Sequence, residues 1–306
     1  MKNTIYALGF FDGVHLGHQA LLKACYNLSH SHGCSTGVVT FASHPDTLVR
    51  RNTPHLINSP RDREWLLREK YHVEILVTLP FDEAMRSMPW EQFLDMLRRH
   101  YDAAGFVCGE DFRFGHLGAG NAQTLKEYCN RENLPCSVVP DQILDDVRIS
   151  STYIRRQLED GDMATAVKFL GHPHVLSGTV VHGKALGRKL GVPTANLQLP
   201  EGLAIPKFGV YACSCIIDGQ RYPAVTNIGT RPTVEGQGIT VEPWILDYSG
   251  DLYDREITIE FYKFLRPEQK FPSLEALQAE IRRNAEQTRE LVSKEFTYSH
   301  LFYAEK

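Results

Sequence analysis

The stretch GFFDGVHLGH at residues 9–18 restricts the possible folds of this 306-residue chain more than any other segment. It follows a short apolar run at 5–8. The apolar residues that come after it recur at helical spacing: Leu21, Leu22, Cys25 and Leu28. A strand, a glycine-rich turn and a helix are therefore predicted. Such a turn directs free backbone N–H groups and the positive end of a helix dipole toward one point, which suits a phosphate group.

Two histidines lie within this turn, His15 and His18, separated by a leucine and Gly17. At this spacing both imidazoles can face one pocket, and Gly17 allows a ligand to approach the backbone closely. Paired imidazoles can donate hydrogen bonds to a triphosphate as negative charge develops between its α- and β-phosphates. The alternative is a pair of ordinary surface histidines at the start of a helix.

The first half of the chain alternates between short apolar runs and amphipathic segments. Strands are predicted at 5–8, 36–41, 73–79, 104–108 and 136–139, and helices at 61–71, 90–101, 123–129, 153–158 and 164–170. This alternation predicts βα units with a parallel sheet and helices on both faces. Ligands of such folds bind outside the carboxyl ends of the strands, where the glycine-histidine stretch is expected.

Two further stretches are expected at the same edge. The segment GEDFRFG at 109–115 combines charged groups with two phenylalanines, which suits a planar heterocycle that carries a phosphate, although the phenylalanines could simply pack beneath the loop. The segment RISSTYIR at 148–155 places three hydroxyl residues at the start of a helix. These hydroxyls either cap the helix or form a second phosphate cradle together with the arginines.

The second half changes character after residue 172, where Gly-His-Pro-His ends the last helix of the first half. Strands are predicted at 177–182, 209–217, 221–227, 240–248 and 256–264, with no helix between them. We therefore expect two domains, 1–172 and 173–306, of which the second is a small antiparallel β-barrel. A terminal helix follows, with Ser273 as its cap.

A glycine-rich basic loop opens the second half. Gly183, Lys184, Gly187 and Arg188 can wrap phosphates with backbone N–H groups, although the same composition is also typical of a plain surface loop. Thr194 and Asn196 alternate just beyond it. A hydroxyl and an amide oxygen are hard ligands that suit Mg²⁺, with ATP phosphates and water completing the shell.

Composition excludes several classes of function. A net charge of −4 argues against a nucleic-acid partner, and no apolar run approaches the 18 residues of a membrane span. The N-terminus lacks the pattern of a signal peptide. Seven scattered cysteines indicate reduced thiols, so a cytoplasmic location is expected. His172 and His174 lack the neighbouring ligands of a zinc site, and no role is assigned to them.

Taken together, the motifs resemble the bacterial bifunctional riboflavin kinase/FAD synthetase (FMN adenylyltransferase) family over almost the whole chain. The first three stretches occur in the family's adenylyltransferase domain in this order, and Pro-Thr-Ala-Asn at 193–196 resembles its riboflavin kinase signature. Three positions depart from the pattern: Ser43 replaces a proline, Gly118 ends a stretch that is often basic, and Pro243 follows the expected catalytic base.

The resemblance implies a Rossmann-like nucleotidyltransferase domain followed by the barrel. The barrel domain would transfer the γ-phosphoryl group of ATP to riboflavin, giving FMN. The first domain would transfer AMP from ATP to FMN, giving FAD and pyrophosphate. Both reactions would require Mg²⁺, with flavins and ATP as the small-molecule partners. The oligomeric state is not predicted.

The resemblance also implies residue roles. His15, His18 and Glu242 would be catalytic, with Glu242 as the base of the kinase. ATP or its phosphates would be bound in the adenylyltransferase by Gly9, Phe10, Asp12, His15, His18, Asp111, Arg148, Ser151, Thr152 and Arg155. His44 and Phe112 would bind flavin there. In the kinase, Arg266 would bind flavin, and ATP would be bound by Gly183, Lys184, Gly187, Arg188, Thr194 and Asn196, the last two through the metal.

Two alternatives stay open. The first is a riboflavin kinase whose N-terminal domain only binds or senses flavin nucleotide, which the departures at Ser43 and Gly118 favour. The second is a tRNA-modifying or synthetase-like enzyme, which His-x-Gly-His alone would also fit. That class would need a basic RNA-binding region, and none is evident in the sequence.

Overall fold

The computed structural model describes residues 3–49, 54–183, 192–233 and 236–301. The chain divides into two compact units, 1–153 and 154–306. The domain boundary predicted near residue 172 lies inside the second unit, directly after helix α8 (Met163–Leu170). Because α8 packs against β15 (Glu256–Arg266) of the second unit, the helix belongs structurally with the barrel that follows it. Residue 172 stays a prediction for the boundary between the two functions.

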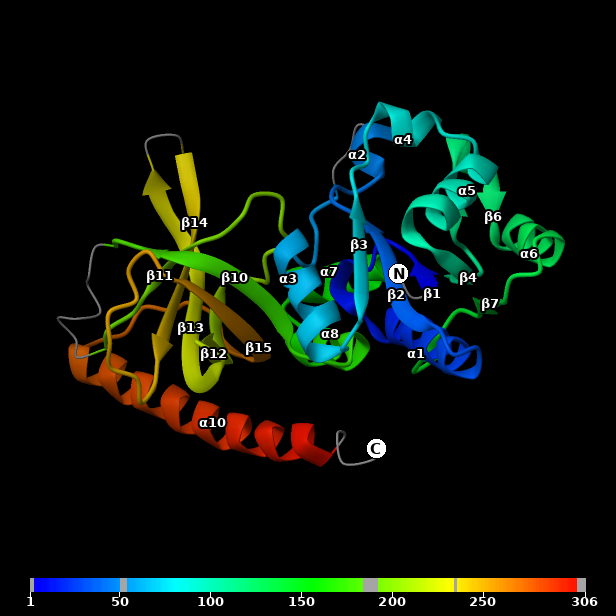
Figure 1. The fold of residues 1–306 in the computed structure, drawn as a ribbon. Helices are drawn as coiled ribbons and strands as arrows, with labels where there is room; N and C mark the ends of the chain where they lie inside the picture. The colour runs from blue at the N-terminus through cyan, green and yellow to red at the C-terminus, as the bar shows by residue number, and fades with distance from the viewer. Residues whose placement is uncertain (1–2, 50–53, 184–191, 234–235, 302–306) are drawn as a thin grey trace. The chain divides into compact units, whose positions relative to one another are not determined.

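The first unit contains a parallel five-stranded sheet in the order β3-β2-β1-β4-β7 (Figure 1). The strands are β1 (Thr4–Leu8), β2 (Ser35–Phe41), β3 (Ile75–Leu79), β4 (Ala103–Gly109) and β7 (Cys136–Val139). Every residue of β1 is buried, as expected for a central strand with helices on both faces. The predicted Rossmann-like architecture is confirmed.

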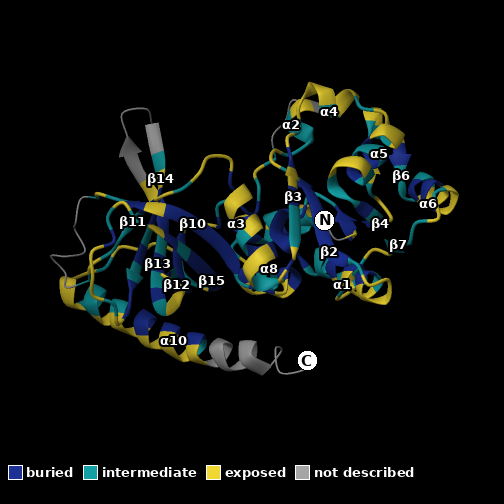
Figure 2. Cartoon of the chain, viewed as in Figure 1, coloured by how far each residue is buried: buried dark blue, intermediate teal, exposed yellow. Residues whose placement is uncertain are grey.

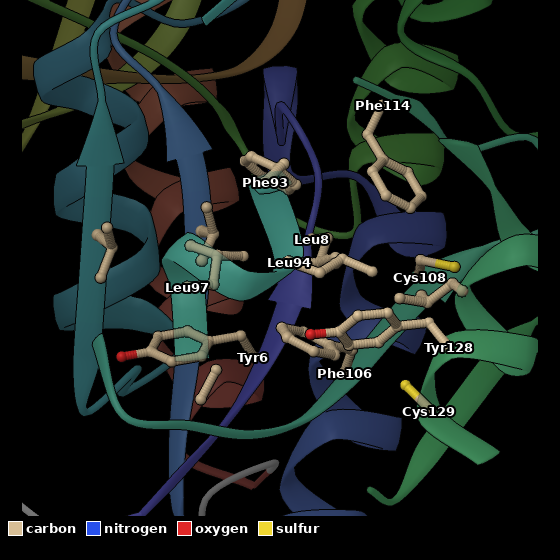
Figure 3. Close-up of a cluster of buried hydrophobic side chains, with 14 of the residues drawn as sticks. Tyr6, Leu8, Phe93, Leu94, Leu97, Phe106, Cys108, Phe114, Tyr128 and Cys129 are labelled. Atoms are coloured by element: carbon tan, nitrogen blue, oxygen red, sulfur yellow. The ribbon is translucent and has the colours of Figure 1, made fainter. Parts of the chain in front are cut away.

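Helices cover both faces of this sheet. Helix α1 (Leu16–Ser31) packs on one face, and the Cys25 thiol there donates to the Ile5 carbonyl at 3.2 Å. Helices α5 (Trp90–Tyr101) and α6 (Ala122–Arg131) pack on the other, over a core that includes Tyr6, Leu8, Phe106 and Tyr128 (Figure 3). This core holds the carboxyl edge of the sheet, and hence the site, in place.

Short elements connect the main layers. They are η1 (Asp12–Val14), α2 (Asp46–Val49), α3 (Pro60–Trp65), η2 (Leu66–Lys70), α4 (Glu83–Ser87), β5 (Arg113–Phe114), η3 (His116–Gly118), β6 (Gly120–Asn121), β8 (Ile143–Leu144) and β9 (Val147–Arg148). The helix predicted at 61–71 is thus α3 followed by the π-helical turn η2. Strand β3 starts two residues later than predicted because the left-handed backbone of His72 (φ 51°) extends the preceding turn.

The second unit contains a closed antiparallel barrel in the order β10-β11-β14-β13-β12-β15. Its strands are β10 (His174–Val181), β11 (Asn196–Gln198), β12 (Gly209–Ile217), β13 (Gln220–Thr233), β14 (Gly236–Ile245) and β15. Strand β10 pairs with both β11 and β15, which closes the barrel. The predicted barrel is confirmed, but β11 was not predicted, and β14 ends before 248 because Asp247 takes a left-handed conformation (φ 60°).

Side chains alternate between the two faces of the barrel strands. Tyr211, Cys213 and Cys215 of β12 are fully buried in the apolar interior, together with Ile259 and Phe261 of β15. Strand β12 is buried along most of its length (Figure 2). The opposite face of β12 and β13 packs against helix α10 (Leu274–Leu301), which follows the predicted Ser273 cap. Helix α7 (Ser151–Asp160) precedes α8. Because successive side chains of a strand point to opposite faces, residues of β12 and β13 alternate between the barrel interior and the face covered by α10.

Two candidate active sites

The turn after β1 is strained where the site is built. Phe11 (φ 60°), Gly13 (φ 80°) and Val14 (φ 40°) all have left-handed backbone angles. Such a conformation is unusual for a β-branched residue such as Val14, and strain of this kind persists only where the surroundings enforce it. The turn directs the chain into α1, whose N-cap residue is His15. The predicted strand, turn and helix are confirmed.

The two histidines of the turn are stacked. Their ring centroids lie 3.7 Å apart with an interplanar angle of 15°. The backbone N–H of His18 donates to His15 Nδ1 at 3.3 Å, so one imidazole caps the helix on which the other lies. Burial lowers the pKa of His18 well below its usual value, and the neighbouring His15 and Arg63 lower it further. A neutral ring has one N–H donor, which suits a hydrogen bond to an incoming anion.

Arg63 is a buried cation beside this pair that sequence reasoning missed. Its guanidinium carbon lies 4.2 Å from the centre of the Phe10 ring, and Nη2 donates to the Phe41 carbonyl at 2.6 Å. Burial lowers the pKa of Arg63 to about 10. No sequence signal separates it from Arg61 and Arg68 of the same segment. The residue supports the aromatic wall of the site and adds positive potential behind His18.

A cavity of about 540 Å³ opens at the carboxyl ends of the parallel strands. Nearly all residues predicted for the adenylyltransferase line it: Gly9, Phe10, His15, His18, His44, Asp111, Phe112, Arg148, Ser151 and Thr152. The structure thus brings together residues from four separate stretches of sequence. They meet because the carboxyl ends of parallel strands share one edge of the sheet.

Two predicted residues are placed differently. Asp12 is buried beneath the turn, where Oδ1 accepts hydrogen bonds from the backbone N–H groups of Ile57 (2.9 Å) and Asn58 (3.3 Å). Its side chain is not part of the cavity lining, and it instead anchors the segment before α3. Arg155, one turn into α7, belongs to the second compact unit. Its phosphate-binding role stays a prediction.

The start of α7 is tied directly to the strained turn. Ser151 Oγ donates to the Asp12 carbonyl at 2.9 Å, and the backbone N–H of Tyr153 donates to Ser150 Oγ at 3.2 Å. Ser150 therefore caps the helix, which is one of the two roles predicted for the hydroxyl residues of this stretch. Because Ser151 and Thr152 line the same cavity as His18, the N-terminal ends of α1 and α7 converge on one space. Two helix N-termini at one point favour an anionic ligand.

Charged and aromatic groups surround the rest of this cavity. Arg148 bridges two carboxylates, with Nη2 at 2.5 Å from Asp111 Oδ2 and Nε at 2.7 Å from Asp141 Oδ2. An incoming phosphate would compete with these carboxylates for the guanidinium. The Phe10 and His44 rings meet edge to face at 4.6 Å. These aromatic rings offer a surface for a planar heterocycle.

The second cavity, of about 670 Å³, lies in the second unit between the barrel and the start of α10. Residues from five elements and two loops line it: Val192, Thr194, Val210, Val225, Asn227, Glu242, Trp244, Arg266, Glu268, Gln269, Phe271, Ser273, Leu274, Leu277, Ile281 and Asn284. The lining is largely apolar, with a few polar groups at defined places. This composition is typical of a pocket for a flat organic ligand.

Glu242 is half-buried on β14, on the face of the barrel that carries the cavity. It pairs across the strands with Asn227, whose Nδ2 donates to Glu268 Oε1 at 3.0 Å. The following Pro243 lies within β14, and its carbonyl accepts from the backbone N–H of Ala195 at 2.9 Å. The departure from the family pattern at 243 therefore leaves the strand continuous beside Glu242.

Arg266 is held in place at the other side of this cavity. Its Nε lies 3.1 Å from Asn284 Oδ1 and 3.3 Å from Glu280 Oε1, both on α10. Burial lowers the pKa of its guanidinium. Its guanidinium carbon lies 5.4 Å from the centre of the Phe271 ring, another lining residue. A cation and an aromatic ring thus face the cavity together.

Of the two predicted metal ligands, Thr194 lines the cavity, whereas Asn196 lies at the start of β11 outside the cavity lining. Thr194 also forms a β-bridge with Trp244. The Asn196 amide lies so close to Gly183 that a Cβ at 183 would meet Nδ2 at 2.2 Å. A side chain at 183 would therefore displace the Asn196 amide. Lys184, Gly187 and Arg188 lie outside the described residues.

These two residues fit a magnesium ion that is shared with a substrate. Within the described part of the chain, no group of three or more His, Cys, Asp or Glu side chains could hold a metal ion. Thr194 and Asn196 offer neutral oxygens alone, so a Mg²⁺ held there would also need phosphate oxygens. That donor set suits a metal that arrives with ATP.

Comparisons with known proteins agree with this division into two sites. A family model for FAD synthetase matches residues 1–153, and one for riboflavin kinase matches residues 170–292. A bifunctional riboflavin kinase/FMN adenylyltransferase from Listeria monocytogenes is 33% identical over 95% of this chain and 93% of its own. The Escherichia coli K12 protein of that description is 35% identical over 96% and 93%.

Among solved structures, a crystal structure described as a macrolide-efflux protein from Streptococcus pneumoniae is similar, with a TM-score of 0.83 and 31% identity. The similarity covers 94% of each chain. Within the described residues of the present chain, none of the helices combines the length and the apolar character needed to cross a membrane.

Proposed function

The chain belongs to the family of bifunctional riboflavin kinases/FMN adenylyltransferases, and from this premise we propose how its two cavities divide the two reactions. The first cavity adenylylates FMN, and the second phosphorylates riboflavin. The extents of the family models support this division, because the FAD synthetase model spans the lining of the first cavity and the riboflavin kinase model spans that of the second.

In the first cavity, a phosphate oxygen of FMN attacks the α-phosphorus of ATP and pyrophosphate leaves. The convergence of the α1 and α7 N-termini beside the stacked histidines carries this proposal. His15 and His18 donate hydrogen bonds to the phosphates as charge moves onto the leaving group. Ser151, Thr152 and Arg148 position the two phosphate-bearing substrates, the last after exchanging its carboxylate partners for phosphate.

In the second cavity, Glu242 accepts the proton of the ribityl hydroxyl of riboflavin as that oxygen attacks the γ-phosphorus of ATP. The half-buried position of Glu242 at the cavity wall carries this part of the proposal. Arg266 and Phe271 contact the flavin. Thr194 and Asn196 hold Mg²⁺, which supplies charge neutralisation on the phosphates when it is bound. Lys184 and Arg188 are proposed to bind ATP from the loop outside the described residues.

The substrates are small molecules, and no nucleic-acid partner is part of the proposal. A cytoplasmic location is proposed as well, supported by seven cysteines that are all free thiols. The full chain is taken as the active unit, with the kinase function assigned to 173–306.

Product chromatography tests the proposal. Riboflavin, ATP and Mg²⁺ are incubated with the full-length protein, and we expect FMN to form first and FAD to follow. In a second reaction that starts from FMN, FAD and pyrophosphate should appear in equal amounts. Kinase activity without any FAD formation would contradict the assignment of the first cavity and favour an N-terminal flavin-sensing domain.

A further inference from the structure

Four neighbouring strands of the barrel bring residues of the second cavity into one row. Val210 of β12 pairs directly with Asn227 of β13, and Asn227 pairs with Glu242 of β14. On its other side, Val210 pairs with Arg266 at the end of β15. Residues that pair directly point to the same face of a sheet, and all four line the cavity. The row therefore runs from Arg266 through Val210 and Asn227 to Glu242.

This row sets the direction in which a flavin can lie. Neighbouring strands lie about 4.8 Å apart, so the row from Arg266 to Glu242 spans about 14 Å. At its first end, the Arg266 guanidinium carbon lies 5.4 Å from the centre of the Phe271 ring, which suits a flat ring system. At its other end, Thr194 bridges to β14 from the side opposite β13, so the proposed magnesium site lies beyond Glu242. The middle of the row is therefore left for the ribityl chain, which joins the ring system to the reacting hydroxyl.

Asn227 and Glu268 place polar groups over the middle of this row. Asn227 Nδ2 donates to Glu268 Oε1 at 3.0 Å, and both residues line the cavity. Gly229 lies two residues further along β13 and therefore on the same face. A Cβ at 229 would meet Glu268 Oε1 at 2.5 Å, so the glycine leaves room for this carboxylate. The Glu268 carboxylate therefore lies against β13 at Asn227 and Gly229.

The bond between these two side chains leaves acceptors for hydroxyl groups. An ionised carboxylate accepts hydrogen bonds through both oxygens, and a carboxamide oxygen accepts them as well. Because Asn227 Nδ2 donates to Glu268 Oε1, the Asn227 Oδ1 and the Glu268 Oε2 remain as acceptors on adjoining side chains. Hydroxyl groups along an extended sugar-alcohol chain can donate to both, and those that donate to the carboxylate form the stronger, charge-assisted bonds. The middle of the row therefore matches a polyhydroxyl chain in its chemistry as well as in its place.

We propose that Asn227 and Glu268 bind the hydroxyl groups of the ribityl chain and thereby select flavins that carry such a chain. This inference rests on the proposed kinase function of the second cavity. The flavin ring system lies at Arg266, the chain passes over Asn227, and its terminal hydroxyl reaches Glu242. Asn227 and Glu268 are thus specificity-determining residues, because they contact the part of riboflavin that a bare flavin ring lacks.

A matched pair of flavins tests the proposal in the full-length protein. Riboflavin is the substrate of FMN formation, and lumiflavin, which carries a methyl group in place of the ribityl chain, is added as a competitive inhibitor. In Asn227→Ala, the KM for riboflavin should rise roughly three- to tenfold, as expected for one lost hydrogen bond, whereas the Ki of lumiflavin stays at the parent value. Glu268→Ala, at an exposed position after β15, should have the same effect and tests the same contact if Asn227→Ala does not fold. Glu286→Ala, which removes an exposed carboxylate of α10, is the matched control.

The comparison of the two flavins separates the possible outcomes. A rise of the riboflavin KM and the lumiflavin Ki by the same factor would overturn the proposal, because the side chains would then act on the ring system or on the shape of the cavity. Unchanged values for both flavins in both variants would overturn it as well. FAD formation from supplied FMN should stay at the parent rate throughout. Absence of FMN formation in the parent protein would instead refute the proposed kinase function, before any variant is compared.

Discussion

The two cavities of this chain place their polar groups in opposite ways. In the first, the groups lie at backbone-defined points: a left-handed turn and the N-terminal ends of α1 and α7. In the second, they are side chains at alternate positions of β13 and β14, together with Arg266 and residues of α10. Backbone geometry therefore holds the first site, whereas strand register holds the second.

This difference determines how each site can fail. At the first, the strained Val14 and the His15 cap depend on local contacts, so a single side chain can be removed while the turn persists. At the second, a slip of one residue in β14 would turn Glu242 into the barrel interior and present Pro243 instead. The four predictions that follow use this contrast, from the largest expected effect to the smallest.

Glu242→Gln should have the largest effect. It keeps the size and position of the side chain on β14 but removes the proton acceptor, and general-base catalysis is typically worth about 10²- to 10⁴-fold. FMN formation should fall within that range, while FAD formation from supplied FMN stays at the parent rate. Riboflavin binding, measured by fluorescence quenching, should be nearly unchanged. A folded variant that phosphorylates riboflavin within a few-fold of the parent would refute the assignment.

His18→Ala reverses the pattern. Loss of one hydrogen-bond donor at developing charge typically lowers a rate by about 10²- to 10³-fold, so FAD formation should drop by that amount. FMN formation should stay near the parent level, because the turn after β1 belongs to the other site. His100→Gln, at an exposed position on α5, is the matched control. Equal loss of both activities in a folded His18→Ala protein would contradict the separation of the sites.

His174 tests the stability of the second unit against acid. The side chain is fully buried, and burial together with His172 lowers its pKa to about 3 from the usual 6.5. The neutral ring is thus favoured in the folded state, and its contribution to stability is complete above pH 6.5 and is lost as the pH falls toward 3. Proton uptake by the unfolded chain should lower the free energy of unfolding by about 2 kcal/mol at pH 5 relative to pH 8.

Calorimetry of the parent and of His174→Leu measures that contribution. Between pH 8 and pH 5, the free energy of unfolding should fall by about 2 kcal/mol less in the leucine variant than in the parent. His100→Gln should retain the full difference. If His174→Leu and the parent lose the same stability between these pH values, the buried imidazole is not the cause.

Thr194→Ala and Asn196→Ala should have the smallest effects on rate. Removal of one neutral ligand corresponds to about 1.4 kcal/mol, so FMN formation should require roughly tenfold more Mg²⁺ for half-maximal rate. FAD formation should show the parent Mg²⁺ dependence. Identical magnesium titrations of FMN formation in variant and parent would show that these residues are not ligands.

The sequence predicted the structural features that depend on residues close to one another along the chain. The strand, turn and helix around His15 occur as predicted. The Ser273 cap does so too. Each depends on residues that are close in sequence, and the glycines and caps involved have few alternatives. The parallel sheet followed from the alternation of strand and helix for the same reason.

What depended on distant contacts was not predictable. Asp12 reads as a site residue, yet its direction is decided by the backbone of Ile57 and Asn58, which lie far along the chain. In the sequence, Arg63 does not differ from the other arginines of its charged helix, and only the fold places it over Phe10. Each requires the tertiary arrangement before its role can be recognised.

The pairing that closes the barrel also sets an order of events during protein synthesis. Residues 174–179 of β10 pair with residues 256–261 of β15, so the first strand of the barrel has no partner on that side until the last one has left the ribosome. The five parallel strands of the first unit are complete at Val139. The first unit can therefore fold while the chain is still growing, whereas the barrel must wait for contacts of long sequence separation.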